Sequence, residues 1–249
     1  VIFQLLFPQQ TAMQPTEKNQ KEQIQPANSI DENILKDNEI IQTKDQVIDI
    51  NERVTIDTTV LKGSINLKGA ILDDLTLLNY NKSLEKDSEN INLFLPNGTS
   101  NPYYIELGWK QIENSKKIDL PNNETHWKTT SSTLKPGNPI SLTWTNKQNI
   151  TFKIHYSIDD NYLFDITQEI ENNSFENIEV FPYRLIKRVN LPETINFFIL
   201  HEGLISLLNN ELLEKKYKAL IDDCSSTNAS KKLFCDQKST GGWLGFTDK

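Results

Sequence analysis

Residues 140–172, ISLTWTNKQNITFKIHYSIDDNYLFDITQEIEN, decide the fold class of this chain. Apolar and aromatic residues alternate with polar ones through 140–144, 150–156 and 162–170, and polar turn residues separate the three segments. A period of two is typical of β-strands, and one apolar face per strand is typical of an antiparallel sheet packed on a single side. The run therefore predicts a three-stranded antiparallel meander.

The same alternation continues towards the N-terminus, and helical periodicity is nearly missing from the rest of the chain. Val54, Ile56, Thr58 and Val60 alternate with polar residues, and a similar pattern precedes Gly69. Several short strands with polar turns between them predict an all-β fold built as a sandwich of large antiparallel sheets, with little helix.

One stretch, residues 204–220, is ambiguous between a helix and a hairpin. Its leucines recur at spacings of four, which suits an amphipathic helix. However, Asn209 and Asn210 interrupt the apolar runs, and both can adopt the positive φ of a tight hairpin turn. We favour the hairpin, with a helical turn after Glu214.

Composition limits the classes of function. With 249 residues, 37% of them apolar, the chain can bury a sizeable core without metals or many disulfides. Its 26 Lys and Arg face 34 Asp and Glu, for a net charge of −8. Because nucleic-acid surfaces are usually basic, we expect no nucleic-acid partner.

The chain divides into three regions. Residues 1–8 form a short apolar run that ends at Pro8. A membrane-spanning helix needs about 20 residues, so we interpret this run as the end of a truncated transmembrane helix; a stray hydrophobic terminus is the alternative. Residues 9–45 lack the apolar density for a core and are expected to be a disordered polar linker. Residues 46–249 are expected to form the β-sandwich domain.

The histidines do not form a recognisable metal or catalytic motif. His126, His155 and His201 lie on separate predicted elements, and none has another ligand at a metal-binding spacing. His201 and Glu202 could act as an acid/base pair, but a hydrogen-bonded histidine at a strand end is commoner. We therefore expect no metal, no cofactor and no enzymatic activity.

Two pairs of adjacent aspartates are candidates for catalytic carboxylates. They are Asp73 with Asp74, and Asp159 with Asp160. Neighbouring residues of a strand point to opposite faces, and aspartate is common in turns, so we interpret all four as turn acids.

The cysteines and tryptophans allow two readings each. Cys224 and Cys235 fit no zinc or redox motif and are expected to form a disulfide in an oxidising compartment, with two reduced thiols as the alternative. Four tryptophans could offer stacked faces to a sugar or lie in the core, namely Trp109, Trp127, Trp144 and Trp243. Trp144 is in register with buried strand positions, which favours the core for it, whereas Trp109 and Trp127 stay open.

Several strings of residues, taken together, resemble a known family, the large periplasmic domain of YidC, the bacterial membrane protein insertase. The strings occur in the same order over about residues 60–249, and they are Leu67 to Leu75, Tyr103 to Trp109, Leu134 to Trp144, Asp159 to Ser174, Pro182 with Tyr183, Leu191 to Glu193, Phe198 to Gly203 and Gly241 to Lys249. The stretch that contains Cys224 and Cys235 departs from the family pattern.

The resemblance implies a β-supersandwich, similar to galactose mutarotase and carbohydrate-binding proteins, in the periplasm at the bacterial inner membrane. It implies a domain of an insertase that works alone or with the Sec translocon on nascent membrane proteins, through a groove in membrane helices that are not in this sequence. The fragment would then be a scaffold and docking domain, attached to the membrane through flanking helices. The alternative is a carbohydrate-binding or mutarotase-like β-sandwich protein.

The final residues are the positions for which we expect a specific role. Glycines give backbone freedom, and a tryptophan suits a membrane interface. We therefore predict a membrane-proximal hinge, against the alternative of a tight turn with a core tryptophan, in a segment made of Gly241, Gly242, Trp243, Gly245, Asp248 and Lys249.

Overall fold

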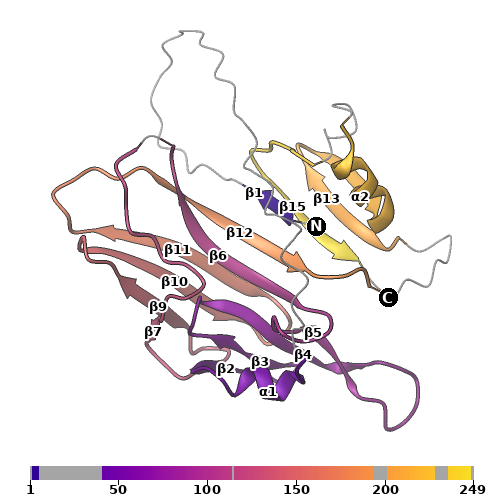
Figure 1. Ribbon diagram of the computed structural model, residues 1–249. Coiled ribbons are helices and arrows are strands. Elements are labelled where there is room, and N and C mark those ends of the chain that lie inside the picture. The colour runs from indigo at the N-terminus through magenta and orange to yellow at the C-terminus, as the bar shows by residue number, and fades with distance from the viewer. Residues whose placement is uncertain (1, 6–40, 114, 193–200, 228–234, 248–249) are drawn as a thin grey trace.

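The computed structural model describes residues 2–5, 41–113, 115–192, 201–227 and 235–247 (Figure 1). In these residues the fold is mostly β, as the alternating pattern predicted, and the strands form three sheets. All the strand pairs are antiparallel except that of β2 with β8.

The largest sheet has eight strands, and it supplies one layer of the sandwich. Its order is β1 (Ile2–Leu5), β12 (Val180–Arg188), β6 (Tyr103–Gln111), β4 (Ile71–Asn81), β3 (Leu61–Asn66), β2 (Arg53–Asp57) and β8 (Thr133–Leu134), with β5 (Asn90–Phe94) paired to β4.

The second sheet contains the predicted meander, which is confirmed. Its order is β11 (Phe164–Asn172), β10 (Ile150–Ile158), β9 (Ile140–Thr145) and β7 (Lys128–Thr129). Asn149 adopts φ 61° in the β9–β10 turn, a conformation that asparagine tolerates better than most residues.

The core lies where these two sheets pack face to face. Alternate residues of β2, β3 and β4 meet alternate residues of β9 and β10 in one buried cluster. Trp109 of the large sheet contacts Phe152 of the second sheet, with ring centroids 5.0 Å apart. Burial of one face of each strand thus explains the period-two pattern.

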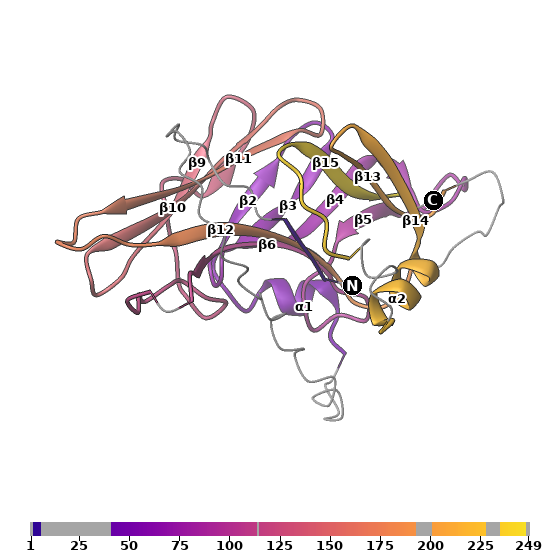
Figure 2. The same ribbon diagram turned by 90° about the horizontal axis from the view of Figure 1, so that it is seen from above.

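The third sheet is small and lies with helix α2 (Tyr217–Ser225) at one end of the sandwich (Figures 1 and 2). Its order is β14 (Glu211–Lys216), β13 (Gly203–Leu208) and β15 (Gly242–Thr247). The predicted hairpin is confirmed, since Asn209 and Asn210 form its turn with φ of 52° and 64°. The predicted helical turn begins at Tyr217 and continues for 9 residues.

The N-terminal regions are described only in part. Residues 2–5 of the range expected to end a membrane helix form strand β1, which pairs with β12, and the other residues of 1–8 lie outside the described residues. Most of the predicted linker, 9–40, also lies outside them. Its last residues enter helix α1 (Lys44–Ile48), where Thr43 and Gln46 form a capping box. No described helix is long and apolar enough to cross a membrane.

Candidate functional site

The third sheet and α2, which we call the C-terminal module, expose apolar side chains on one face. The other face is buried through Leu204 and Leu208. On the exposed face, Leu212 of β14 and Trp243 of β15 both pair with Leu207 of β13, so the three side chains form a row across the sheet. Leu212 is 58% exposed and Trp243 is 49% exposed, which is uncommon for large apolar residues in a paired sheet. We call these three residues the apolar row.

An aromatic junction joins the C-terminal module to the sandwich. It consists of Tyr103 and Arg188, which pair at the end of β6 and β12, and of Tyr217 and Phe246 from the module. The Arg188 guanidinium lies 4.7 Å from the centroid of the Tyr103 ring and 5.9 Å from that of Tyr217. Phe246 stacks on Tyr217 with centroids 5.9 Å apart and meets the Tyr103 ring edge to face at 6.5 Å. Cation–π and aromatic contacts of this kind fix the module to the large sheet.

The predicted hinge residues fall mostly within paired backbone. Gly242, Trp243 and Gly245 belong to β15 and pair with β13, while Asp248 and Lys249 lie outside the described residues. Gly242 has φ +121°, and a Cβ there would lie 2.0 Å from the Leu207 carbonyl oxygen. At Gly245 and at Gly241, which precedes the strand, a Cβ would meet nothing within 4 Å. The hinge remains a prediction, and Gly241 is the only one of these three glycines outside strand β15.

Covalent and ionic contacts hold α2 in the module. The structure has a disulfide between Cys224 of α2 and Cys235, in the segment that leads to β15. On the opposite side, Lys215 of β14 lies 2.5 Å from a carboxylate oxygen of Asp223. The helix is therefore tied to β14 and to the segment that leads to β15.

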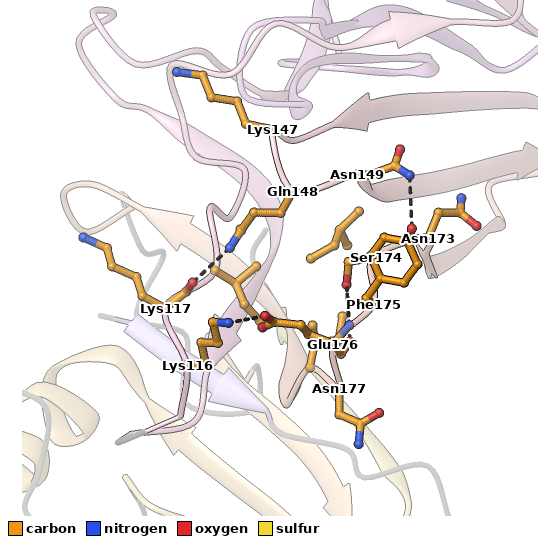
Figure 3. A pocket seen from close by; sticks show the side chains of 13 residues that line it. Lys116, Lys117, Lys147, Gln148, Asn149, Asn173, Ser174, Phe175, Glu176 and Asn177 are labelled. Carbon is orange, nitrogen blue, oxygen red and sulfur yellow. Dashed lines mark hydrogen bonds and ion pairs between the residues drawn. The ribbon is translucent and has the colours of Figure 1, made fainter.

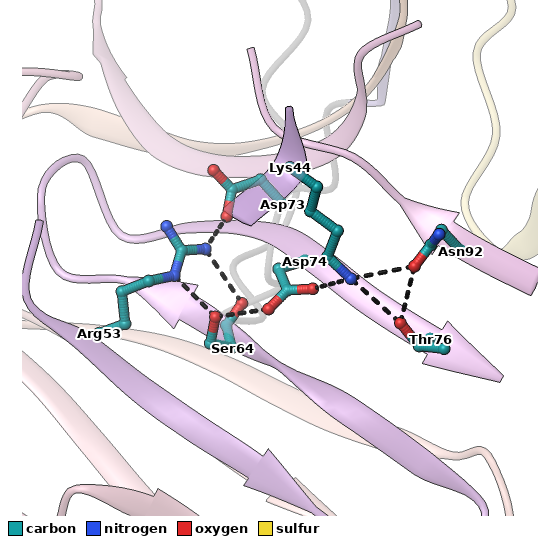
Figure 4. A network of polar contacts seen from close by, with 7 residues as sticks. All are labelled: Lys44, Arg53, Ser64, Asp73, Asp74, Thr76 and Asn92. Atoms are coloured by element: carbon teal, nitrogen blue, oxygen red, sulfur yellow. Dashed lines mark hydrogen bonds and ion pairs between the residues drawn. The ribbon is translucent and has the colours of Figure 1, made fainter. Parts of the chain in front are cut away.

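The interpretation of Asp73 and Asp74 as turn acids is wrong, because both are buried in β4 (Figure 4). The register between β3 and β4 shifts at this point: Ser64 faces Asp74, Ile65 faces Leu72, and Asp73 has no partner residue on β3. Such a bulge lets two consecutive acids turn inward, which regular alternation forbids.

A buried polar network places a cation beside each of the two carboxylates. Arg53 pairs with Asp73 and donates from Nε to the Ser64 hydroxyl at 2.6 Å, and that hydroxyl donates to Asp74 at 2.7 Å. Lys44 of α1 lies 2.6 Å from the other Asp74 oxygen. Burial raises the pKa of Asp73, against the opposing effect of the Arg53 charge. Both carboxylates are ion-paired in this network, so neither is free to act as a catalytic group. The pair of Lys44 with Asp74 also anchors α1 to the large sheet.

A second candidate site is a cleft beside the start of β12, the strand whose other end reaches the aromatic junction (Figure 3). Three loops form it, at residues 116–118, 147–150 and 173–178, and its volume is about 340 Å³. Ile118 and Ile150 are buried at its floor, whereas the Phe175 side chain on the rim is fully exposed. Three lysines line it, and one of them, Lys116, pairs with Glu176. No sequence pattern points to this cleft, because its lining comes from three loops far apart in the chain.

The remaining candidate residues have ordinary structural roles. Asp159 is a turn acid, as predicted, and accepts hydrogen bonds from the backbone N–H groups of Asn161 and Leu163 at 2.9 Å. His155 contacts Ser141 and Glu169, and His201 contacts the Leu204 carbonyl at 2.8 Å. Within the described ranges, no group of three or more His, Cys, Asp or Glu could hold a metal ion.

Three of the four tryptophans, Trp109, Trp127 and Trp144, do not form a sugar platform. Trp109 is 4% exposed and Trp127 is 5% exposed, and their rings stack on each other with centroids 6.2 Å apart. Trp144 is partly buried and packs against the core. A sugar ring needs an open aromatic face. Trp127 lines a pocket of only about 10 Å³, which is too small for a sugar ring, and Trp109 and Trp144 line none of the described clefts.

Comparisons with known proteins agree on one family. The family model described as "YidC periplasmic domain" matches residues 53–249. "Membrane protein insertase YidC" of Methylorubrum extorquens (strain PA1) is 40% identical over 198 residues, which are 79% of this chain and 32% of that protein. The protein of the same name from Mesorhizobium japonicum is 38% identical over 208 residues, covering 83% of this chain and 33% of its own length. The chain thus spans about a third of the length of the curated relatives it matches.

Proposed function

The chain belongs to the YidC periplasmic domain family, and from that premise we propose that it is the scaffold and docking domain of a membrane protein insertase. In this proposal the domain positions the membrane part of the protein and does not itself form the path for inserted chains. The family places it in the periplasm at the bacterial inner membrane. Its partners would be nascent membrane proteins and components of the Sec translocon.

The observation that carries the proposal is the apolar row on the C-terminal module. Leu212, Leu207 and Trp243 present a continuous apolar strip, and surfaces of this kind usually mark contacts with a partner or a membrane. Tryptophan is enriched at membrane interfaces, where its amphipathic ring sits at the headgroup level. We therefore assign docking against the membrane part of the insertase to this face.

The aromatic junction supports the scaffold role. A docking face can orient the membrane part only if it is fixed rigidly to the rest of the domain. Arg188 makes this connection, because its guanidinium contacts the rings of both Tyr103 and Tyr217. The apolar row and the large sheet would therefore move as one body when the module contacts the membrane part.

The test compares variants of the full-length insertase that carries this domain. The double variant Leu212→Ala and Trp243→Ala should reduce membrane insertion of a reporter protein several-fold. Because both side chains are about half exposed, it should lower the free energy of unfolding of the chain by about 2 kcal/mol in total, which leaves a domain of ordinary stability folded. The matched control is Leu163→Ala, since Leu163 is 68% exposed in the β10–β11 turn and belongs to no element of the module. Normal insertion by the double variant, or an equal defect in the control, would refute the proposal.

A further inference from the structure

We propose that the cleft beside the start of β12 binds an acidic, extended peptide segment of a partner protein. Lys117 and Lys147 would pair with carboxylates, and Phe175 with the isoleucine floor would take up an apolar side chain (Figure 3). The proposal does not rest on the proposed function, because it concerns another surface and a different measurement.

The charge of the cleft differs in sign from that of the chain. The whole sequence carries a net charge of −8, yet the lining has three lysines and one acid, Glu176. Glu176 is already paired with Lys116. Among the described residues, Lys117 and Lys147 have no ion-pair partner, and both side chains are exposed. Two free cations on separate loops are complementary to two carboxylates on one ligand.

The cleft walls are held in place by hydrogen bonds between the loops. The Gln148 side chain donates to the Lys117 carbonyl at 3.1 Å and accepts from the Asp119 backbone N–H at 2.8 Å. The Asn149 side chain donates to the Asn173 carbonyl at 3.1 Å. A ligand would therefore meet a preformed site, which lowers the entropic cost of binding.

The shape and place of the cleft favour a peptide over a small anion or a lipid. A small anion would use the lysines but not the floor of Ile118 and Ile150 or the exposed ring of Phe175. A volume of about 340 Å³ is at the lower end of the range of ligand pockets and suits one or two side chains. Strand β12 begins beside the cleft at Val180 and ends in the aromatic junction at Arg188, a distance of about 26 Å for eight strand steps. The cleft thus lies far from the face assigned to the membrane.

The experiment measures binding of a fluorescein-labelled peptide, Asp-Glu-Leu-Leu-Glu-Asp, to the chain by fluorescence anisotropy. Binding should saturate and weaken as salt is raised, and a peptide with lysine in place of each acid should not bind. The variant Lys117→Glu with Lys147→Glu should weaken binding about tenfold, which corresponds to about 1.4 kcal/mol. The matched control, Lys86→Glu with Lys135→Glu, makes the same change of net charge at lysines outside the cleft and should stay within about twofold of the wild type.

The apolar part of the site has its own test, and so does the choice of ligand. Phe175→Ala should weaken peptide binding while thermal unfolding stays unchanged, because that side chain is fully exposed, and Phe175→Leu should restore most of the affinity. Vesicles of phosphatidylglycerol should not compete with the peptide. Absence of saturable binding, equal losses in the two lysine pairs, or binding to vesicles and not to peptide would each overturn the proposal.

Discussion

Replacement of Gly242 by alanine should detach strand β15 from β13. The added Cβ would lie 2.0 Å from the Leu207 carbonyl oxygen and 3.1 Å from its carbon, and both atoms belong to backbone that cannot move aside alone. The φ of +121° at this position adds strain for any residue with a side chain. Strain of this kind costs about 1 to 3 kcal/mol, and loss of the terminal strand hydrogen bond adds about 1 kcal/mol. We therefore expect the pairing of β15 to be weakened by about 3 kcal/mol.

Hydrogen exchange of the β13 and β15 amides is the assay, because it reports opening of this strand separately from global unfolding. The control is Gly245→Ala in the same strand, where a Cβ meets nothing within 4 Å and φ is not in the strained region. That variant should keep wild-type protection, since alanine in a strand costs less entropy than glycine. If Gly242→Ala kept the protection of β15, the steric argument would be refuted, and the strand end would be free enough to serve as the predicted hinge.

Three further predictions concern stability. Arg53→Met should lower the free energy of unfolding by about 3 kcal/mol in urea denaturation, because it leaves the buried Asp73 carboxylate without its cation. A reductant should lower the free energy of unfolding by up to about 3 kcal/mol, because it opens the bond between Cys224 and Cys235; equal labelling of the thiols with and without reductant would contradict this prediction. Hydrogen bonds from Lys153 hold the pKa of Glu169 below its ordinary 4.5. This pair therefore stabilises the folded chain above pH 4.5, and its contribution is lost as the pH falls through the lowered pKa. Lys153→Gln should make the free energy of unfolding, measured in acid titration, fall less steeply with decreasing pH.

The sequence predicted the parts of the fold that depend on neighbouring residues. The meander of 140–172 follows from alternation alone, because each of its strands buries one face. The hairpin at Asn209 and Asn210 follows from local backbone preference, since asparagine adopts positive φ at low cost. The resemblance to the YidC periplasmic domain rests on the same local strings, and the family match confirms it.

The placement of Asp73 and Asp74 could not be predicted in this way. Their burial depends on a register shift between β3 and β4 and on cations that come from Arg53 and from Lys44 of α1. The register between two strands is set by the packing of whole strands. The local sequence of two adjacent acids therefore does not distinguish a turn from a β-bulge.

The local pattern by itself therefore determined the fold class, the meander, the hairpin and the family of this protein. Only the tertiary structure decided that Leu212, Leu207 and Trp243 lie in one row, that Arg188 lies between two tyrosine rings, and that three distant loops form a cleft with free lysines. The reason is that strand formation depends on a period of two within a few residues, whereas a surface depends on which strands and loops become neighbours, and that choice belongs to the packing of the whole chain.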